Sequence, residues 1–368
     1  MDRKLFSKEV VNKGRQKEFD WAKAFTIMVM LTIHTYEELS VVDINQRPTG
    51  IFRNVLEFLA GPLGAPLFMF SMGIGMMYSR NTEPGKMCFR GVKLMRNGYL
   101  LSFFKGTVFV IIGTLLGEET PISISDSLFL VSILQFAGMA FFAIALMKKL
   151  KLPLPGMLAV SLILSVAGTC LNTYDMTGWK QYLLGLFFMT NEVTSFPLFL
   201  WLYYPVAGMI FAYFLLRVND KKRFYTMLFI FSVIGIILTS VIYYLCGIDL
   251  KSMYMLMNRT FYTQSVWHYI FTTFVILAGM SVYYALSELI TAEPVVRFVS
   301  FLGKNLDVVY IVQWLVVSYI EVIIVATNSP KLSLYMVVPV GLILLVVSMC
   351  ITNIYLKVRA KRQAKKKN

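Results

Sequence analysis

The chain has 368 residues, of which 57% are hydrophobic and 15% charged, and its formal net charge is +15. Apolar runs of about 20 residues, the length that crosses a hydrocarbon core, recur from Trp21 to Leu356 with no long polar stretch between them. This pattern excludes a soluble catalytic module and a solenoid repeat. The basic residues are dispersed and have no nucleic-acid-binding motif beside them, so anionic membrane lipids, and not nucleic acid, are the expected partners.

The pattern predicts an all-α, polytopic membrane bundle of about ten transmembrane helices. Residues 21–357 form its single domain, after a cytoplasmic N-terminal arm of residues 1–20 and before a cytoplasmic basic tail of residues 358–368. The spans are expected at residues 21–42, 52–79, 94–116, 127–147, 153–171, 197–217, 224–246, 266–290, 299–325 and 333–357. The apolar stretch 179–189 is too short to cross, so we expect an interfacial or re-entrant helix; as a full span it would be the eleventh.

The distribution of basic residues predicts the orientation. With ten spans, 28 of the 35 Lys and Arg residues fall in the N-terminal arm, the C-terminal tail and the loops on the same side, and 6 fall in the opposite loops. Loops rich in Lys and Arg face the cytoplasm. Both termini are therefore expected in the cytoplasm, most simply at a bacterial plasma membrane.

The first span carries the most informative residue, His34. It lies about 20 Å from Trp21 along the helix axis, deep in the hydrocarbon core, where an ionisable group normally faces a cavity, a partner or a substrate path. Glu37 and Glu38 follow at three and four residues, on the same side of the helix. The alternative is a structural histidine with two glutamates that reach outward to water.

The second span contains Gly61, Pro62, Gly64 and Pro66, which should break or kink it. A basic cluster then joins the second and third spans and could hold phosphates as well as lipid headgroups. Its members are Arg80, Lys86, Arg90, Lys93 and Arg96.

Further polar residues lie inside later spans at similar depth. Lys105, about 13 Å beyond Arg96, is too deep for comfortable snorkelling and well placed to meet an anion. The others are Gln135 in the fourth span, and Gln313 and Glu321 in the ninth. His268 lies at the outer mouth of the eighth span, where an ordinary interfacial role is the alternative to a role in the site. Cys170 and Cys246 could meet outside, although unpaired cysteines are favoured. No metal site is expected, because no ligand set accompanies the two histidines.

Five short motifs, in this order and spacing, resemble the transmembrane acyltransferase superfamily, closest to its heparan-alpha-glucosaminide N-acetyltransferase-like branch. They are FDWAKA at 19–24 leading to His34, GAPLFMF at 64–70 with Met72 and Gly73, ILQ at 133–135, FPLFLWL at 196–202, and LGKN at 302–305 followed by Tyr310. Two features depart from these relatives. Gln313 stands where they often carry histidine, and the run from His34 to Glu38 differs from the arginine-containing first-helix motif of the wider acyltransferase family 3.

The resemblance implies transfer of an acyl group, usually acetyl from coenzyme A, to a carbohydrate or glycolipid hydroxyl or amine at the outer face. His34 is then the candidate general base, or itself an acyl carrier, with Glu37 and Glu38 to orient it. Lys105, Gln135, Gln313 and His268 are candidates for binding the substrate and the oxyanion. Arg80, Arg90, Lys93 and Arg96 are candidates for holding acetyl-CoA.

Two other functions remain open at this stage, and so does a homodimer. Broken helices, an intramembrane lysine and carboxylates also suit a transporter or flippase of a glycan or lipid precursor. A degenerate family member that acts as a membrane partner or sensor is suggested only by Gln313.

Overall fold

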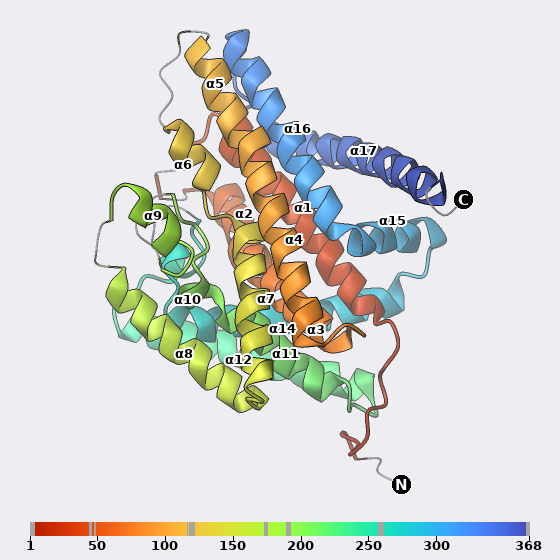
Figure 1. Cartoon of the computed structure of the whole chain (residues 1–368). Helices are drawn as coiled ribbons and strands as arrows, with labels where there is room; N and C mark the ends of the chain where they lie inside the picture. Colours follow the sequence, from red (N-terminus) through yellow and green to blue (C-terminus); the bar gives the residue numbers. More distant parts are fainter. Residues whose placement is uncertain are drawn as a thin grey trace.

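The computed structural model describes residues 4–43, 46–47, 49–115, 117, 122–172, 176–188, 193–256 and 261–365. Over these residues the chain is a bundle of α-helices with only three isolated β-bridges and no strand (Figure 1). This confirms the all-α, polytopic prediction. The helices are α1 (Lys17–Leu39), α2 (Ile51–Leu63), α3 (Ala65–Tyr78), α4 (Pro84–Ser102), α5 (Val108–Leu115), α6 (Ile124–Phe129), α7 (Ile133–Lys149), α8 (Leu154–Leu171), α9 (Trp179–Leu184), α10 (Leu198–Trp201), α11 (Tyr203–Leu215), α12 (Lys221–Leu245), α14 (Val266–Leu289), α15 (Glu293–Lys304), α16 (Leu306–Ala326) and α17 (Val337–Lys365), with a π-helical turn η1 (Phe103–Thr107) and two 3₁₀ turns, η2 (Leu250–Met253) and η3 (Leu334–Met336).

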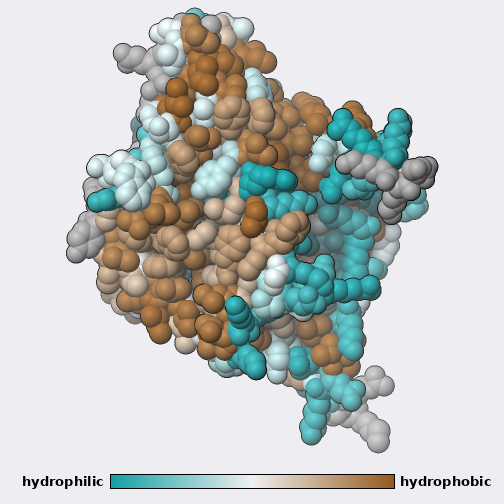
Figure 2. Space-filling view, viewed as in Figure 1, coloured by the Kyte–Doolittle hydropathy of each residue, from teal (hydrophilic) through white to brown (hydrophobic). Residues whose placement is uncertain are grey.

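Eight helical segments among the described residues are long and apolar enough to cross a membrane. They correspond to eight of the ten predicted spans. The other two coincide with α1, whose charged and polar residues lower its hydropathy, and with α7, which has only 17 residues. The chain is an integral membrane protein, and the number of spans stays a prediction. Figure 2 shows a broad hydrophobic surface, with hydrophilic side chains gathered towards the N-terminus and the C-terminal helix.

The predicted break in the second span is confirmed at Gly64, where α2 ends and α3 begins. Pro62 lies inside α2 and Pro66 in the first turn of α3, so neither can donate a helical hydrogen bond. A Cβ atom at Gly64 would come within 2.1 Å of the Ala60 carbonyl oxygen. The sharp step between the two helices therefore requires glycine at this position.

Several predicted boundaries differ from the structure because a helix need not end where the hydrocarbon core ends. Helix α4 begins at Pro84, so the basic residues of its first turns lie on a helix and not in a loop. The ninth span begins at Leu306, because residues 299–304 belong to α15, which buries Val299 and Leu302 and leads into α16. Helix α17 continues through the predicted tail as far as Lys365.

The two ends of α1 contact different connecting segments. At one end the N-terminal arm packs on the α11–α12 connection, where the Ser7 amide donates to the Arg217 carbonyl at 2.7 Å and Lys221 pairs with the buried Glu18. At the other end Ser40 and Leu332 form a β-bridge. That the first of these ends faces the cytoplasm stays a prediction.

Cysteine labelling in intact cells, in a background free of the four native cysteines, tests this orientation. Lys86→Cys should be labelled only after permeabilisation, and Ile122→Cys directly, because both side chains are exposed, in segments predicted to lie on opposite sides of the membrane. Glu118 and Glu119, the acidic residues of the predicted outer loop, lie outside the described residues. Labelling of both positions from the same side would overturn the ten-span topology.

Candidate active site

His34 lies near the end of α1, 7% exposed, in the wall of a cavity of about 160 Å³ that we call the histidine chamber. Its ring packs on Trp314 of α16, with ring centroids 3.7 Å apart and planes inclined by 31°. Its Nδ1 atom is 3.4 Å from Nε2 of the buried Gln313. Helix α16 therefore holds the imidazole, through one ring contact and one polar contact.

The orienting partner expected from sequence spacing was a carboxylate, and the structure corrects this. Within the part of the chain that the structure describes, no hydrogen bond joins His34 to Glu37 or Glu38. Glu37 lines the chamber with His34, whereas Glu38 does not. Spacing of three and four residues places side chains on the same side of a helix but does not make them touch. Gln313 takes the orienting position.

The orientation of the Gln313 amide decides which nitrogen of His34 can act as a base. When the amide N–H donates to Nδ1, the neutral ring carries its proton on Nε2; when the amide oxygen accepts from Nδ1–H, Nε2 is free to accept a proton. Oε1 of Gln313 is buried and has no partner among the described residues. Exchanging the amide oxygen and nitrogen of Gln313 gives this oxygen a partner and leaves Nε2 of His34 as the basic nitrogen, with the amide nitrogen then in the place that the oxygen leaves.

Lys105 enters the same chamber from the π-helical turn η1 between α4 and α5. Its Nζ atom lies 2.9 Å from the centroid of the Trp314 ring, a cation–π contact. Single π-helical turns often occur at functional sites because they re-aim one side chain. The lysine expected from sequence to meet an anion thus faces the chamber, within electrostatic reach of Glu37, Glu38 and Glu321.

Two of the residues predicted to bind the substrate cap helices in the structure. Gln135 forms a capping box with Ser132 at the start of α7 and donates to Ser102 of α4 at 3.1 Å. His268 forms the equivalent cap of α14, where its Nδ1 lies 2.9 Å from the Ser265 hydroxyl. Neither lines the histidine chamber. Each is the third residue of its helix, a position from which a side chain reaches back to the preceding backbone.

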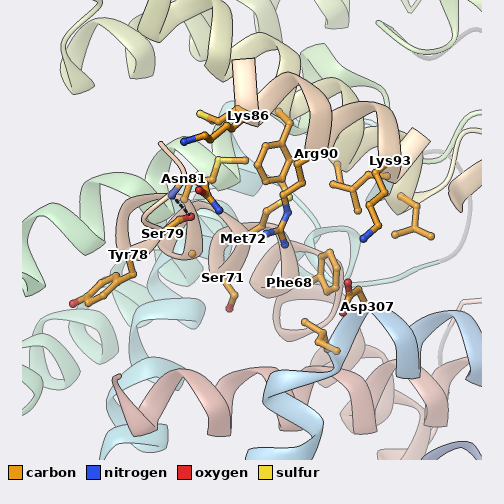
Figure 3. A pocket seen from close by; sticks show the side chains of 18 of the residues that line it. Phe68, Ser71, Met72, Tyr78, Ser79, Asn81, Lys86, Arg90, Lys93 and Asp307 are labelled. Atoms are coloured by element: carbon orange, nitrogen blue, oxygen red, sulfur yellow. Dashed lines mark hydrogen bonds between the residues drawn. The ribbon is translucent and has the colours of Figure 1, made fainter. Parts of the chain in front are cut away.

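A second and larger cavity, of about 820 Å³, lies towards the other end of α1, and we call it the basic cavity (Figure 3). Of the residues predicted to bind coenzyme A, Arg90 and Lys93 line it, whereas Arg80 and Arg96 do not. Arg96 is exposed and bonds to its neighbour Asn97. Lys86, another member of the predicted basic cluster, also lines it; the sequence did not single out Lys23 and Lys304, although both lie within the motifs that carried the resemblance. The five basic residues of the wall are Lys23, Lys86, Arg90, Lys93 and Lys304, with Asp307 as its one acidic residue.

The two cavities are stacked along the same helices. Helices α1, α4, α7 and α16 contribute residues to both walls, and on α16 the change from one cavity to the other occurs between Asp307 and Tyr310. That separation is about one helical turn. Phe68 on the basic-cavity side packs against Tyr310 on the chamber side, with ring centroids 6.2 Å apart. These two rings lie between the cavities.

Residues 16–356 match the acyltransferase domain that defines acyltransferase family 3. The chain belongs to this family. No curated protein and no solved structure matches it. The match covers nearly the whole chain, so the different first-helix run at His34 does not set the chain apart from the wider family of membrane acyltransferases.

The geometry supplies this acyltransferase with the groups that acyl transfer needs. The reaction requires a base to take the acceptor's proton and donors to stabilise the oxyanion. The histidine chamber contains a candidate for each, His34 and Lys105, both in contact with Trp314. The basic cavity gathers five cationic side chains, a set that suits an anionic substrate. Among the described residues there is no cluster of three or more potential metal ligands.

Proposed function

We propose that this acyltransferase moves an acetyl group from coenzyme A in the basic cavity to a carbohydrate or glycolipid acceptor at the outer face, with His34 as the general base. The observation that carries the proposal is the stacking of the two cavities on four shared helices. A donor bound by its phosphates at one end can extend its thioester past Phe68 and Tyr310 towards His34.

The charge and size of the basic cavity favour a coenzyme A donor. Five cationic side chains surround it against a single carboxylate, and charge-assisted hydrogen bonds to phosphate are among the strongest polar contacts. Its volume of about 820 Å³ is in the range of cofactor sites. Binding at the end that the charge pattern predicts to be cytoplasmic also matches the compartment in which coenzyme A is found.

The size of the histidine chamber favours a short acyl group. At about 160 Å³ it is close to the roughly 150 Å³ of engineered cavities that hold a benzene molecule. An acetyl group fits such a space beside His34 and Lys105, whereas a long acyl chain does not. Acetyl is therefore the acyl group that we assign.

The chemistry follows from the two polar groups of the chamber. Nε2 of His34 takes the proton of the acceptor's hydroxyl or amine as that atom bonds to the thioester carbonyl carbon. The Lys105 ammonium group faces the developing oxyanion. When the carbon–sulfur bond breaks, the imidazolium returns the proton to the sulfur of the leaving coenzyme A. The nearer relationship to the heparan-alpha-glucosaminide N-acetyltransferase-like branch is part of this proposal, because it supplies the sugar acceptor.

Transfer of radiolabelled acetyl from acetyl-CoA by the protein purified in detergent tests the function. We expect release of free coenzyme A and labelling of a carbohydrate or glycolipid, with palmitoyl-CoA a much poorer donor because of the size of the chamber. The competing function is transport without chemistry, which the broken second span also suits. Coenzyme A release that never exceeds that of the protein-free control, together with glycolipid flux in proteoliposomes, would establish the transporter instead.

A further inference from the structure

Helix α3 presents a continuous stripe to the basic cavity. Tyr78, Gly75, Ser71 and Phe68 all line that cavity and are three or four residues apart, so they share one face of the helix. The stripe is about 15 Å long, at 1.5 Å of rise per residue. It runs from the end of α3 to Phe68, whose ring packs against Tyr310 of the histidine chamber. We call these four residues the α3 stripe.

Ser71 supplies the polar group of the stripe. It is 4% exposed, and its hydroxyl has no hydrogen-bond partner in the described part of the chain. Other buried serines of the bundle donate to the carbonyl four residues earlier, as Ser232 does at 2.7 Å and Ser281 at 3.0 Å. A buried hydroxyl without a partner is destabilising. The Ser71 hydroxyl is therefore available to a molecule in the cavity.

Gly75 supplies the room. A Cβ atom added there would meet no atom within 4 Å, so open space lies over the helix at this position. Gly73, two residues away, contrasts with it, because its Cβ would come within 1.9 Å of the Pro205 carbonyl oxygen on α11. Gly73 is needed for helix packing and Gly75 is not. The absence of a side chain at Gly75 instead widens the cavity.

We infer that the α3 stripe is the subsite for the pantetheine arm of the donor, an inference that rests on the proposed function. The arm is a long chain that carries two amides, and a serine hydroxyl can donate to an amide carbonyl or accept from an amide N–H. Met72 and Met76 line the same cavity and offer adaptable apolar contacts to the methylene and methyl groups of the arm. A lipid acyl chain in this place would leave Ser71 unpaired.

The arrangement in Figure 3 fits this assignment. Arg90 and Lys93 reach down from α4 over the stripe, and Ser71 lies below them on α3. The phosphates of the donor then lie against the α4 cations, the arm lies along α3, and the thioester comes to Phe68, next to the chamber. The stripe thus sets how deeply the donor is inserted.

Two ligands separate the arm from the nucleotide in calorimetric titrations of the purified full chain. Coenzyme A carries the arm, whereas 3′-phosphoadenosine 5′-diphosphate carries the nucleotide and phosphates only. Gly75→Leu should weaken coenzyme A binding at least about tenfold and leave binding of the nucleotide unchanged, because the leucine side chain enters open space inside the cavity. Leucine is also a better helix former than glycine, so the helix should stay intact.

Ser71→Ala gives a second, smaller perturbation. Loss of one hydrogen bond should weaken coenzyme A binding by roughly three- to tenfold, again with no effect on the nucleotide. Ser348→Ala is the matched control, because Ser348 is also a buried serine with no hydroxyl partner among the described residues but lies on α17, outside both cavities. It should bind both ligands as the wild type does.

The outcomes separate this inference from the proposed function. Wild-type protein that binds neither ligand would overturn the coenzyme A donor, and with it the subsite. Wild-type protein that binds both, with unchanged coenzyme A affinity in Gly75→Leu and Ser71→Ala, would overturn the subsite alone. The subsite would also be overturned if Gly75→Leu weakened binding of coenzyme A and of the nucleotide equally while Ser71→Ala bound coenzyme A as tightly as the wild type. The affected part of the donor would then not be the arm.

Discussion

His34→Gln should abolish acetyl transfer while coenzyme A binding stays close to that of the wild type. Glutamine has a similar reach but cannot take a proton at neutral pH, and loss of general base catalysis lowers rates by about 10²- to 10⁴-fold. The donor's phosphates are held in the basic cavity, whose wall does not include residue 34. The measurement is the rate of acetyl transfer at saturating acetyl-CoA, beside a calorimetric titration with coenzyme A. His34→Ala should be equally inactive.

His268→Gln is the matched control for this prediction. It removes the chain's other histidine, but glutamine at the third position of a helix also forms a capping box, so α14 should keep its start. The activity of this variant should remain within about a factor of two of wild type, because His268 does not line the histidine chamber and the cap is preserved. Near-normal turnover of His34→Gln would make His34 structural, and the catalytic assignment would have to be abandoned.

Replacing Arg90 and Lys93 together by glutamine should weaken coenzyme A binding by about a hundredfold. Each charge-assisted contact to a phosphate contributes on the order of 1.5–3 kcal/mol, which is at least about tenfold per side chain. Both side chains line the basic cavity, and Arg90 also packs over the Phe141 ring at 5.3 Å from its centroid. Isothermal titration with coenzyme A at two salt concentrations measures the effect, and the wild-type affinity should fall as salt rises.

Arg96→Gln separates a specific phosphate contact from a general effect of charge. Arg96 lies on the same helix and is exposed, as Arg90 and Lys93 are, but it does not line the cavity, and its replacement removes one positive charge. Its variant should bind coenzyme A nearly as tightly as the wild type. If the single Arg96 variant and the double variant lost affinity to the same degree for each charge removed, Arg90 and Lys93 would be lipid contacts or topology signals and not a donor site.

The sequence predicted the fold class well because hydrophobic length is a local property. Runs of about 20 apolar residues predict spans one at a time, and the Gly and Pro residues around Gly64 predict a break, with no knowledge of neighbours. Helix ends were predicted less well. Pro84 begins a helix before the predicted span, because a backbone helix continues past the hydrocarbon surface when its own hydrogen bonds allow it. Leu306 begins one inside the predicted span, because the residues before Asn305 belong to α15.

The candidate site was predicted in part. The sequence singled out His34, because an ionisable residue deep in an apolar run is conspicuous by itself. It grouped Arg96 with Arg90, although the helix directs only the second into the cavity. It also missed Trp314, since one aromatic residue among many in apolar helices carries no signal.

What the sequence determined by itself was therefore the membrane bundle, the charge asymmetry between its two ends and the one deeply placed histidine, all of which follow from composition and spacing along the chain. Only the tertiary structure decided which side chains meet. Gln313 and Trp314 reach His34 from a helix about 280 positions away in the chain, and the two cavities exist only because four helices pack side by side. Contacts between distant helices depend on rotation and depth, which periodicity within one helix does not encode.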